Sequence, residues 1–165
     1  MSSNQRHQSF APLIHPDSHT LILGSLPGAE SLRQQQYYAH PYNVFWRLVY
    51  ALFGCEPNPD YAQRCGFILS HGLALWDVCA SAERSGSADT SISAVQANDI
   101  SGLLIAYPNI RRILLNGRKA EYEYQRRFAA LPVATVYVPS TSPAFASLTF
   151  EDKLRSWQAA LALEL

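Results

Sequence analysis

The chain has 165 residues, of which 48% are hydrophobic and 16% are charged, and its formal net charge is zero. This length suits one domain with a single buried core, and the composition excludes a disordered or solvating chain. Zero net charge argues against a strongly basic, non-specific nucleic-acid binder, although a local patch can still grip DNA.

Residues 1–10 are polar and contain no apolar run, so we expect a flexible leader there and no signal peptide. The longest apolar stretches fall far short of a membrane span, which predicts a soluble, intracellular protein. The three cysteines are irregularly spaced, which is typical of reduced thiols and gives no metal-binding pattern.

Four short apolar runs alternate along the chain with segments of helical periodicity. Continuous apolar strands are typical of a parallel sheet that is buried on both faces. We therefore predict an α/β fold in one domain over residues 1–165: a three-layer α/β/α sandwich with a central, mostly parallel four-stranded sheet. The predicted strands are 20–26, 72–78, 111–116 and 135–139, and the predicted helices are 44–53, 60–71, 93–106, 119–130 and 150–163.

The segments that follow the four strands carry the functional information, because ligands of such folds bind at the carboxyl ends of the strands. Residues 25–28 follow the first strand, 77–80 close the second, 116–119 follow the third and 139–143 follow the fourth. All four segments are polar, small or turn-forming. This pattern predicts a concave site at one edge of the sheet.

Four segments, in a fixed order, carry a resemblance to a known family. Residues 24–28 read Gly-Ser-Leu-Pro-Gly, and residues 36–46 read Gln-Tyr-Tyr-Ala-His-Pro-Tyr-Asn-Val-Phe-Trp. Residues 115–120 read Leu-Asn-Gly-Arg-Lys-Ala, and residues 139–144 read Pro-Ser-Thr-Ser-Pro-Ala. Together they resemble the uracil-DNA glycosylase superfamily, most closely its deoxyinosine (hypoxanthine) DNA glycosylase branch, which is related to mismatch-specific uracil- and thymine-DNA glycosylases.

The resemblance implies a monofunctional DNA glycosylase of base excision repair that hydrolyses the N-glycosidic bond of a flipped deaminated base, hypoxanthine first. DNA with such a base is the implied partner, and no metal or other cofactor is implied. We expect a monomer in the cytoplasm, associated with the nucleoid if the cell is prokaryotic. Lys119 is the only lysine in the candidate motifs, so lyase chemistry through a Schiff base is not expected.

Position 26 departs from the uracil-type pattern. Leu26 stands where those enzymes have the Asn or Asp that positions the attacking water, and leucine can neither orient nor deprotonate water. The resemblance to the hypoxanthine branch assigns that catalytic role to Asn43, whose carbonyl oxygen would hold the water. Asn43 would equally serve as the N-cap of the next helix, and both roles require that its amide stays free to reach the ligand.

The resemblance places Tyr38 against the flipped base as a stacking aromatic, whereas Phe45 and Trp46 are predicted to be core residues. Asn116 offers a donor and an acceptor to a base edge, although Asn-Gly is also a common turn. Asp77 and Asp89 can each accept hydrogen bonds from a purine, and the sequence does not choose between them. The predicted base-binding residues are Gly24, Ser25, Leu26, Tyr38, Asp77 and Asn116.

Contacts to the DNA strand are expected from three places. His40 either donates to a phosphate or satisfies the turn at Pro41, and Phe145 either wedges between bases or packs in the core. The basic residues at the start of the helix 119–130 either bind phosphate or face solvent. The predicted DNA-binding residues are His40, Arg118, Lys119, Ser140, Thr141, Ser142 and Phe145.

Three other functions remain open from the sequence. The same enzyme class with uracil or xanthine as its base is one. A nucleotide- or small-molecule-binding α/β module without DNA activity is another, favoured by the zero net charge and by Leu26. The third is a degenerate glycosylase that senses lesions without cutting.

Overall fold

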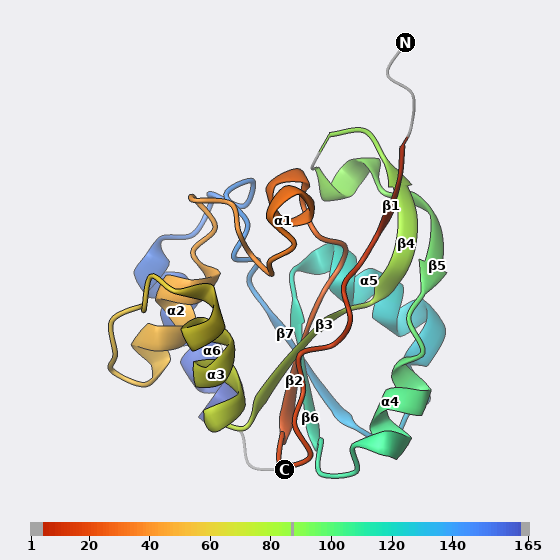
Figure 1. The fold of residues 1–165 in the computed structure, drawn as a ribbon. Helices are drawn as coiled ribbons and strands as arrows, with labels where there is room; N and C mark the ends of the chain where they lie inside the picture. The colour runs from red at the N-terminus through yellow and green to blue at the C-terminus, as the bar shows by residue number, and fades with distance from the viewer. Residues whose placement is uncertain (1–4, 87, 163–165) are drawn as a thin grey trace.

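The computed structural model describes residues 5–86 and 88–162 and has a twisted central sheet with helices on both faces (Figure 1). In space the strands follow the order β3 (Leu73–Asp77), β2 (Thr20–Gly24), β6 (Arg112–Asn116) and β7 (Ala134–Val138). Every neighbouring pair is parallel, so all four strands end at the same edge of the sheet.

Alternate residues of these strands face two separate cores. On one face, Ile22 and Leu114 pack with α2 (Phe45–Leu52), α3 (Tyr61–Ser70) and α6 (Phe150–Ala162). On the other face, Leu23 and Leu115 pack with α4 (Ile100–Ala106) and α5 (Arg118–Phe128). The predicted three-layer α/β/α sandwich with its parallel four-stranded sheet is confirmed, and Phe45 and Trp46 are core residues as expected.

Local hydrogen bonds explain where two of the helices begin. The Asp60 carboxylate accepts from the Gln63 N–H at 3.1 Å and caps α3. Thr149 and Asp152 form a reciprocal capping box, since the Asp152 N–H donates to Thr149 Oγ1 and the Thr149 N–H donates to Asp152 Oδ2. The predicted last residue of this helix, Leu163, lies outside the described residues.

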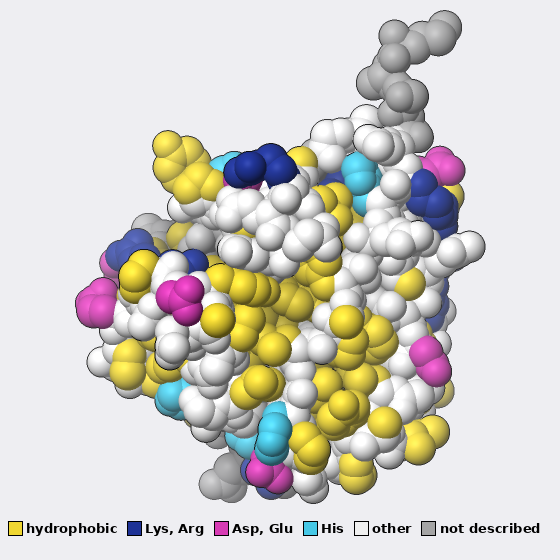
Figure 2. Space-filling model, in the orientation of Figure 1, with side chains coloured by type: hydrophobic (Ala, Val, Ile, Leu, Met, Phe, Trp, Pro, Cys, Tyr) yellow, Lys and Arg dark blue, Asp and Glu magenta, His cyan; other side chains and the backbone are white. Residues whose placement is uncertain are grey.

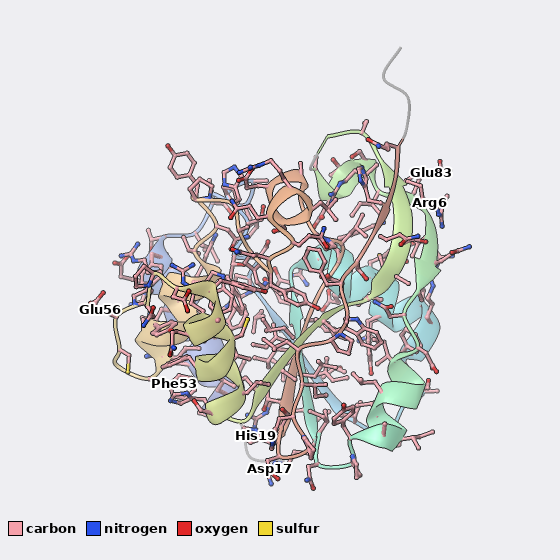
Figure 3. All side chains as sticks on the ribbon, in the orientation of Figure 1. Arg6, Asp17, His19, Phe53, Glu56 and Glu83 are labelled. Atoms are coloured by element: carbon pink, nitrogen blue, oxygen red, sulfur yellow. The ribbon has the colours of Figure 1, made fainter. Side chains whose placement is uncertain are left out.

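A second, three-stranded antiparallel sheet was not predicted. It contains β1 (Gln5–Gln8), β4 (Cys79–Arg84) and β5 (Ser93–Ala97), in the order β1-β4-β5. The expected flexible leader is wrong for its part within 5–8, because pairing with β4 satisfies the backbone groups of β1. In Figure 3 Arg6 and Glu83, which face each other across these two strands, lie together at the rim of this sheet. Residues 1–4 lie outside the described residues.

The predicted helix over residues 93–106 is wrong in its first half. Residues 93–97 pair with β4, and only Ile100–Ala106 is helical. The Asp99 carboxylate accepts from the Gly102 N–H at 2.9 Å, so the helix starts at that cap. The short helix α1 (Ala29–Gln34) and the 3-10 turn η1 (Asp89–Ser91) are further elements that the sequence pattern did not indicate.

The surface in the orientation of Figure 2 carries hydrophobic side chains along its middle, with Lys, Arg, Asp and Glu side chains mainly at its margins. No basic stripe crosses this face, which agrees with the zero net charge. Within residues 5–86 and 88–162, no helix combines the length and the apolar character that a membrane crossing needs.

Candidate active site

A cavity of about 140 Å³ lies at the carboxyl edge of the central sheet, beside α1. The lining includes the ends of β2, β3 and β6, four residues of the segment before α2 (37, 38, 40 and 43), and residues 140–143. The cavity brings together Gly24, Ser25, Leu26, Tyr38, His40, Asn43, Asp77, Asn116, Ser140, Thr141 and Ser142 from the predicted site, and it adds Asp89. Three predicted DNA-binding residues, Arg118, Lys119 and Phe145, do not line it.

The absence of a side chain at position 24 brings two polar groups close together. Gly24 pairs in register with Asp77 on the neighbouring strand. A Cβ atom on Gly24 would lie 2.6 Å from Asp77 Oδ1 and 3.3 Å from the Tyr38 hydroxyl oxygen. Only glycine leaves room for the carboxyl group and the phenol at this place in the cavity wall.

Tyr38 is held on several sides. Its backbone has φ 53°, in the left-handed region that a tyrosine rarely adopts and that costs on the order of 1–3 kcal/mol. Its ring stacks on Phe45 with the centroids 3.9 Å apart, which leaves only one ring face for a base. Burial and the nearby Asp77 carboxyl raise the Tyr38 pKa, so the phenol keeps its proton and remains a donor.

Asn116 links three parts of the site. Its side-chain Nδ2 donates to the Tyr38 hydroxyl at 3.3 Å and to Thr141 Oγ1 at 3.1 Å, while its Oδ1 accepts from the Thr141 N–H at 3.1 Å. The Thr141 carbonyl in turn accepts from the Val44 N–H at the start of α2. Both amide hydrogens of Asn116 therefore have partners inside the protein, and only an Oδ1 lone pair is left for a base edge.

Asn43 lies one residue before the N-cap of α2, which is Val44, so the predicted N-cap position is one residue off. Its Oδ1 accepts from the Phe45 N–H at 2.9 Å and so satisfies the first turn of α2. The residue nevertheless lines the cavity. An amide oxygen has two lone pairs, so one remains for a water molecule while the other holds the helix.

Two carboxyl groups line the cavity, and a buried arginine lies near them. Asp77 is only 5% exposed, and its Oδ2 has no hydrogen-bond partner among the described residues. Burial, reinforced by the neighbouring Asp89, raises the Asp77 pKa to about 7, against the opposing effect of Arg84. Asp89 accepts from Ser25 Oγ at 2.8 Å, and burial raises its pKa as well. Both acids line the cavity, whereas the sequence could not choose between them.

Arg84 is the residue that sequence reasoning missed. It is 1% exposed and donates to the Gly86 carbonyl at 3.1 Å and to the Pro27 carbonyl. Its charge lies close enough to both acids to oppose the rise of their pKa values. Arg84 ends β4, the central strand of the three-stranded sheet, and its burial leaves no signal in the sequence because arginine is usually exposed.

His40 and the loop 140–143 form the rim. The His40 Nδ1 accepts from the Tyr42 N–H at 3.1 Å, so a neutral imidazole carries its proton on Nε2 and can donate from there. In the loop, Ser140 Oγ accepts from the Ser142 N–H, and Ser142 Oγ accepts from the Ala144 N–H. These turns present small hydroxyl side chains at the mouth of the cavity.

The three predicted DNA-binding residues outside the lining have partners of their own. Arg118 pairs with Glu121 at 2.9 Å and stacks over a tyrosine ring, and Lys119 pairs with Glu123 at 2.9 Å. Phe145 lines a neighbouring groove together with Tyr42, whose side chain is 76% exposed. That groove shares residues 141–143 with the cavity, so Tyr42 is an additional exposed aromatic at its margin.

No group of three His, Cys, Asp or Glu side chains in the described part of the chain is arranged to hold a metal ion. The functional groups that line the cavity are amides, hydroxyls, carboxyls and one imidazole.

Comparison with known proteins gives a family match and several relatives. The model of the Uracil DNA glycosylase superfamily matches residues 11–164. A protein of Methanosarcina barkeri named hypoxanthine DNA glycosylase is 37% identical over 140 residues, which cover 84% of this chain and 88% of that protein. One of the same name from Methanosarcina acetivorans is 36% identical over 153 residues, covering 92% and 96%. A solution NMR structure from Methanosarcina acetivorans, provisionally described as a uracil DNA glycosylase, has a TM-score of 0.81 at 34% identity and covers 95% of this chain and 99% of that one.

Proposed function

The chain belongs to the uracil DNA glycosylase superfamily and is a DNA glycosylase, and from that premise we propose that it removes hypoxanthine from deoxyinosine in DNA. The two relatives named hypoxanthine DNA glycosylase support this choice of base. Leu26 supports it too, because the cavity has no amide or carboxylate at the position where uracil-type enzymes hold the water.

The reaction requires that one bond breaks and one forms at the sugar. The C1′–N9 bond breaks and its electron pair goes to the purine, which leaves a positively charged sugar, as in other glycosidic cleavages. A water oxygen then bonds to C1′. One of its protons stays on the new hydroxyl and the other ends on the base, so the products are neutral hypoxanthine and an abasic site.

In this proposal Asn43 holds the water through the free lone pair of Oδ1. The observation that supports the assignment is that Oδ1 accepts from the Phe45 N–H at the start of α2 while Asn43 lines the cavity, so the side chain is oriented before substrate arrives. An amide orients water well but is a poor base. We therefore expect cleavage of the C1′–N9 bond to run ahead of attack by water.

Tyr38 is proposed to stack on the flipped purine with the ring face that Phe45 leaves free. A base–aromatic stack contributes on the order of 1–3 kcal/mol. Asp77, Ser25 and the backbone at Gly24 and Leu26 would contact the base from the other side. Asn116 acts by positioning Tyr38 and Thr141, since its donors are occupied.

DNA is expected to lie across the mouth of the cavity. The Nε2 proton of His40 and the hydroxyls of Ser140, Thr141 and Ser142 are suited to phosphate oxygens, although the Thr141 side chain is buried. Arg118, Lys119 and Phe145 would touch the strand further out. We also propose that the protein acts as a monomer, in the cytoplasm and at the nucleoid of a prokaryote, where the DNA substrate of a DNA glycosylase lies.

The test is a set of duplexes that each carry one deoxyinosine, deoxyuridine or deoxyxanthosine. We expect abasic product from the deoxyinosine duplex at the highest rate. Faster release of uracil or xanthine would keep the enzyme class and overturn the choice of base. A protein that binds free nucleosides but yields no abasic site from any duplex would support the small-molecule-binding alternative instead.

A further inference from the structure

We infer that Asp77 meets the flipped purine as a neutral carboxylic acid and donates its O–H to an acceptor atom of the departing base. The inference rests on the proposed function, because it needs a purine in the cavity. Its new content is the protonation state of Asp77 and the direction of the hydrogen bond.

The first support is the geometry of Asp77. The residue ends β3, and its backbone carbonyl is fixed by the Asn98 side-chain amide at 2.8 Å. Its side chain lies against Gly24, lines the cavity, and is more than nine-tenths buried. Oδ2 nevertheless has no partner in the described part of the chain. A buried polar oxygen without a partner costs on the order of 1–3 kcal/mol, and more when it is charged, so this atom is arranged for a proton or a ligand.

The second support is the charge around the carboxyl group. Asp89 and Glu30 line the same cavity, so three carboxyl groups share it, while His40 is the one basic residue among its described lining residues. Arg84 is buried behind the two aspartates and already donates to two carbonyls. Two acids in a dry site oppose each other's ionisation. The titratable or charged groups that face Asp77 or Asp89 are Arg84 and Cys79 on β4, Asp89 at η1, Tyr37, Tyr38 and His40 before α2, Glu30 on α1 and Lys119 on α5.

The third support is the chemistry of the leaving group. Negative charge builds on the purine as the C1′–N9 bond breaks, and donors directed at that charge lower the barrier. An ionised carboxylate only accepts hydrogen bonds and would repel the charge. A neutral carboxyl group supplies an O–H donor to O6, N3 or N7 of hypoxanthine. Burial raises the Asp77 pKa to about 7, which is consistent with a proton being present at neutral pH.

The excision rate and the stability of the folded protein should both fall as the pH rises. The active form is protonated, so the rate is highest below the Asp77 pKa of about 7 and falls as the pH rises through it. Stability carries the same signature. Between the ordinary value of 3.8 and about 7, the folded protein keeps a proton that the unfolded chain has lost, so stability falls as pH rises through this window.

The experiment measures single-turnover excision of hypoxanthine between pH 5.5 and 8.5. For the natural protein we expect a fall approaching tenfold per pH unit above neutrality. Asp77→Asn keeps an N–H donor but does not titrate, so its profile should lose this fall and keep a rate within about tenfold of the maximum. Asp77→Ala removes the donor and should be slower by about 10²–10³-fold at every pH. Asp17→Asn, an exposed carboxylate at the far end of the molecule (Figure 3), should match the natural protein.

Melting temperatures give a readout that does not depend on activity. Asp77→Asn should melt higher than the natural protein at pH 8 and show a smaller difference at pH 5. A rate that rises with pH, together with loss of activity in Asp77→Asn, would show that Asp77 works ionised. An Asp77→Asn profile that still falls would assign the titration to another group. No abasic product from the natural protein at any pH would instead defeat the proposed function itself.

Discussion

Two groups of residues at the cavity differ in how many of their polar atoms have hydrogen-bond partners. We call Tyr38, Asn43, Asn116 and Thr141 the amide wall, and Ser25, Asp77 and Asp89, with Arg84 behind them, the acidic wall. In the amide wall, hydrogen bonds within the protein hold each side chain: Asn116 donates to Tyr38 and Thr141, and Asn43 accepts from the Phe45 N–H at the start of α2. In the acidic wall, Asp77 Oδ2 and Arg84 Nη1 have no partner among the described residues.

The two walls therefore have different expected roles: the amide wall positions the water and the base, and the acidic wall changes its hydrogen bonds when the base binds. Groups whose hydrogen bonds are already made cannot change partners cheaply, so the amide wall fixes where the water and the base ring lie. Asp77 Oδ2 is buried without a partner, which raises the free energy of the empty site, and in the proposed complex this oxygen gains a partner when the base arrives. We expect substitutions in the amide wall to disturb geometry, and substitutions in the acidic wall to change how the rate depends on pH.

The largest expected effect is at Asn43. Asn43→Ala removes the proposed water ligand and should slow single-turnover excision by about 10²–10³-fold, the range for loss of one preorganised polar group. It also removes the hydrogen bond from the Phe45 N–H at the start of α2, worth about 1 kcal/mol of stability. Asn58→Ala is the matched control, because Asn58 Oδ1 accepts from the Asp60 N–H just before α3 and lies outside the cavity lining. Full activity of Asn43→Ala would show that the amide wall does not hold the attacking water.

Gly24 is where the two walls meet, and Gly24→Ala should disturb both. The new methyl group would lie 2.6 Å from Asp77 Oδ1, so the carboxyl group must move. We expect a loss of at least tenfold in rate and about 1–3 kcal/mol in stability, measured by excision and by urea unfolding. The control is Gly66→Ala on an exposed face of α3, where a Cβ meets nothing within 4 Å, and there helix propensity predicts a gain of about 0.5–1 kcal/mol.

Asn116→Ala tests the positioning part of the amide wall. It leaves the buried Thr141 N–H without an acceptor and frees the Tyr38 hydroxyl, so we expect a loss of about 1–3 kcal/mol in stability. The pH at which the rate falls should stay unchanged, because Asp77 is untouched. Asn109→Ala, which loses only an exposed bond to the Pro16 carbonyl, should cost less in the same unfolding assay. A shifted pH profile would contradict the division into two walls.

His40 should give the smallest effect. His40→Ala removes one proposed phosphate donor at the rim and should weaken binding to a duplex with an abasic-site analogue about two- to tenfold, as expected for one hydrogen bond. The salt dependence of binding should change little, because the substitution removes no lysine or arginine. His15→Ala, at the other end of the sheet, is the control. Unchanged affinity in His40→Ala would show that His40 stabilises the turn at Pro41 and does not contact DNA.

The sequence predicted the central sheet and most of its helices because buried parallel strands and amphipathic helices have strong periodic patterns. It missed β5 because this strand is short and largely exposed, so residues 93–97 have no apolar pattern of their own. The strand is stabilised by pairing with β4, and a local sequence pattern does not reveal that pairing. Tyr38 and Asn43 were found through their motif. The sequence could not show which of Asp77 and Asp89 lies in the cavity. The two residues are twelve positions apart along the chain, and the fold of β4 and η1 brings both to the cavity.

The most direct test of the central claim is the identity of the released product. The natural protein, incubated at pH 6 with a duplex that contains one deoxyinosine, should release free hypoxanthine and form abasic strand in equal amounts. Asn43→Ala, at the same folded concentration, should release about 10²–10³-fold less in the same time. Strand cleavage without free base, or equal release by both proteins, would contradict the account.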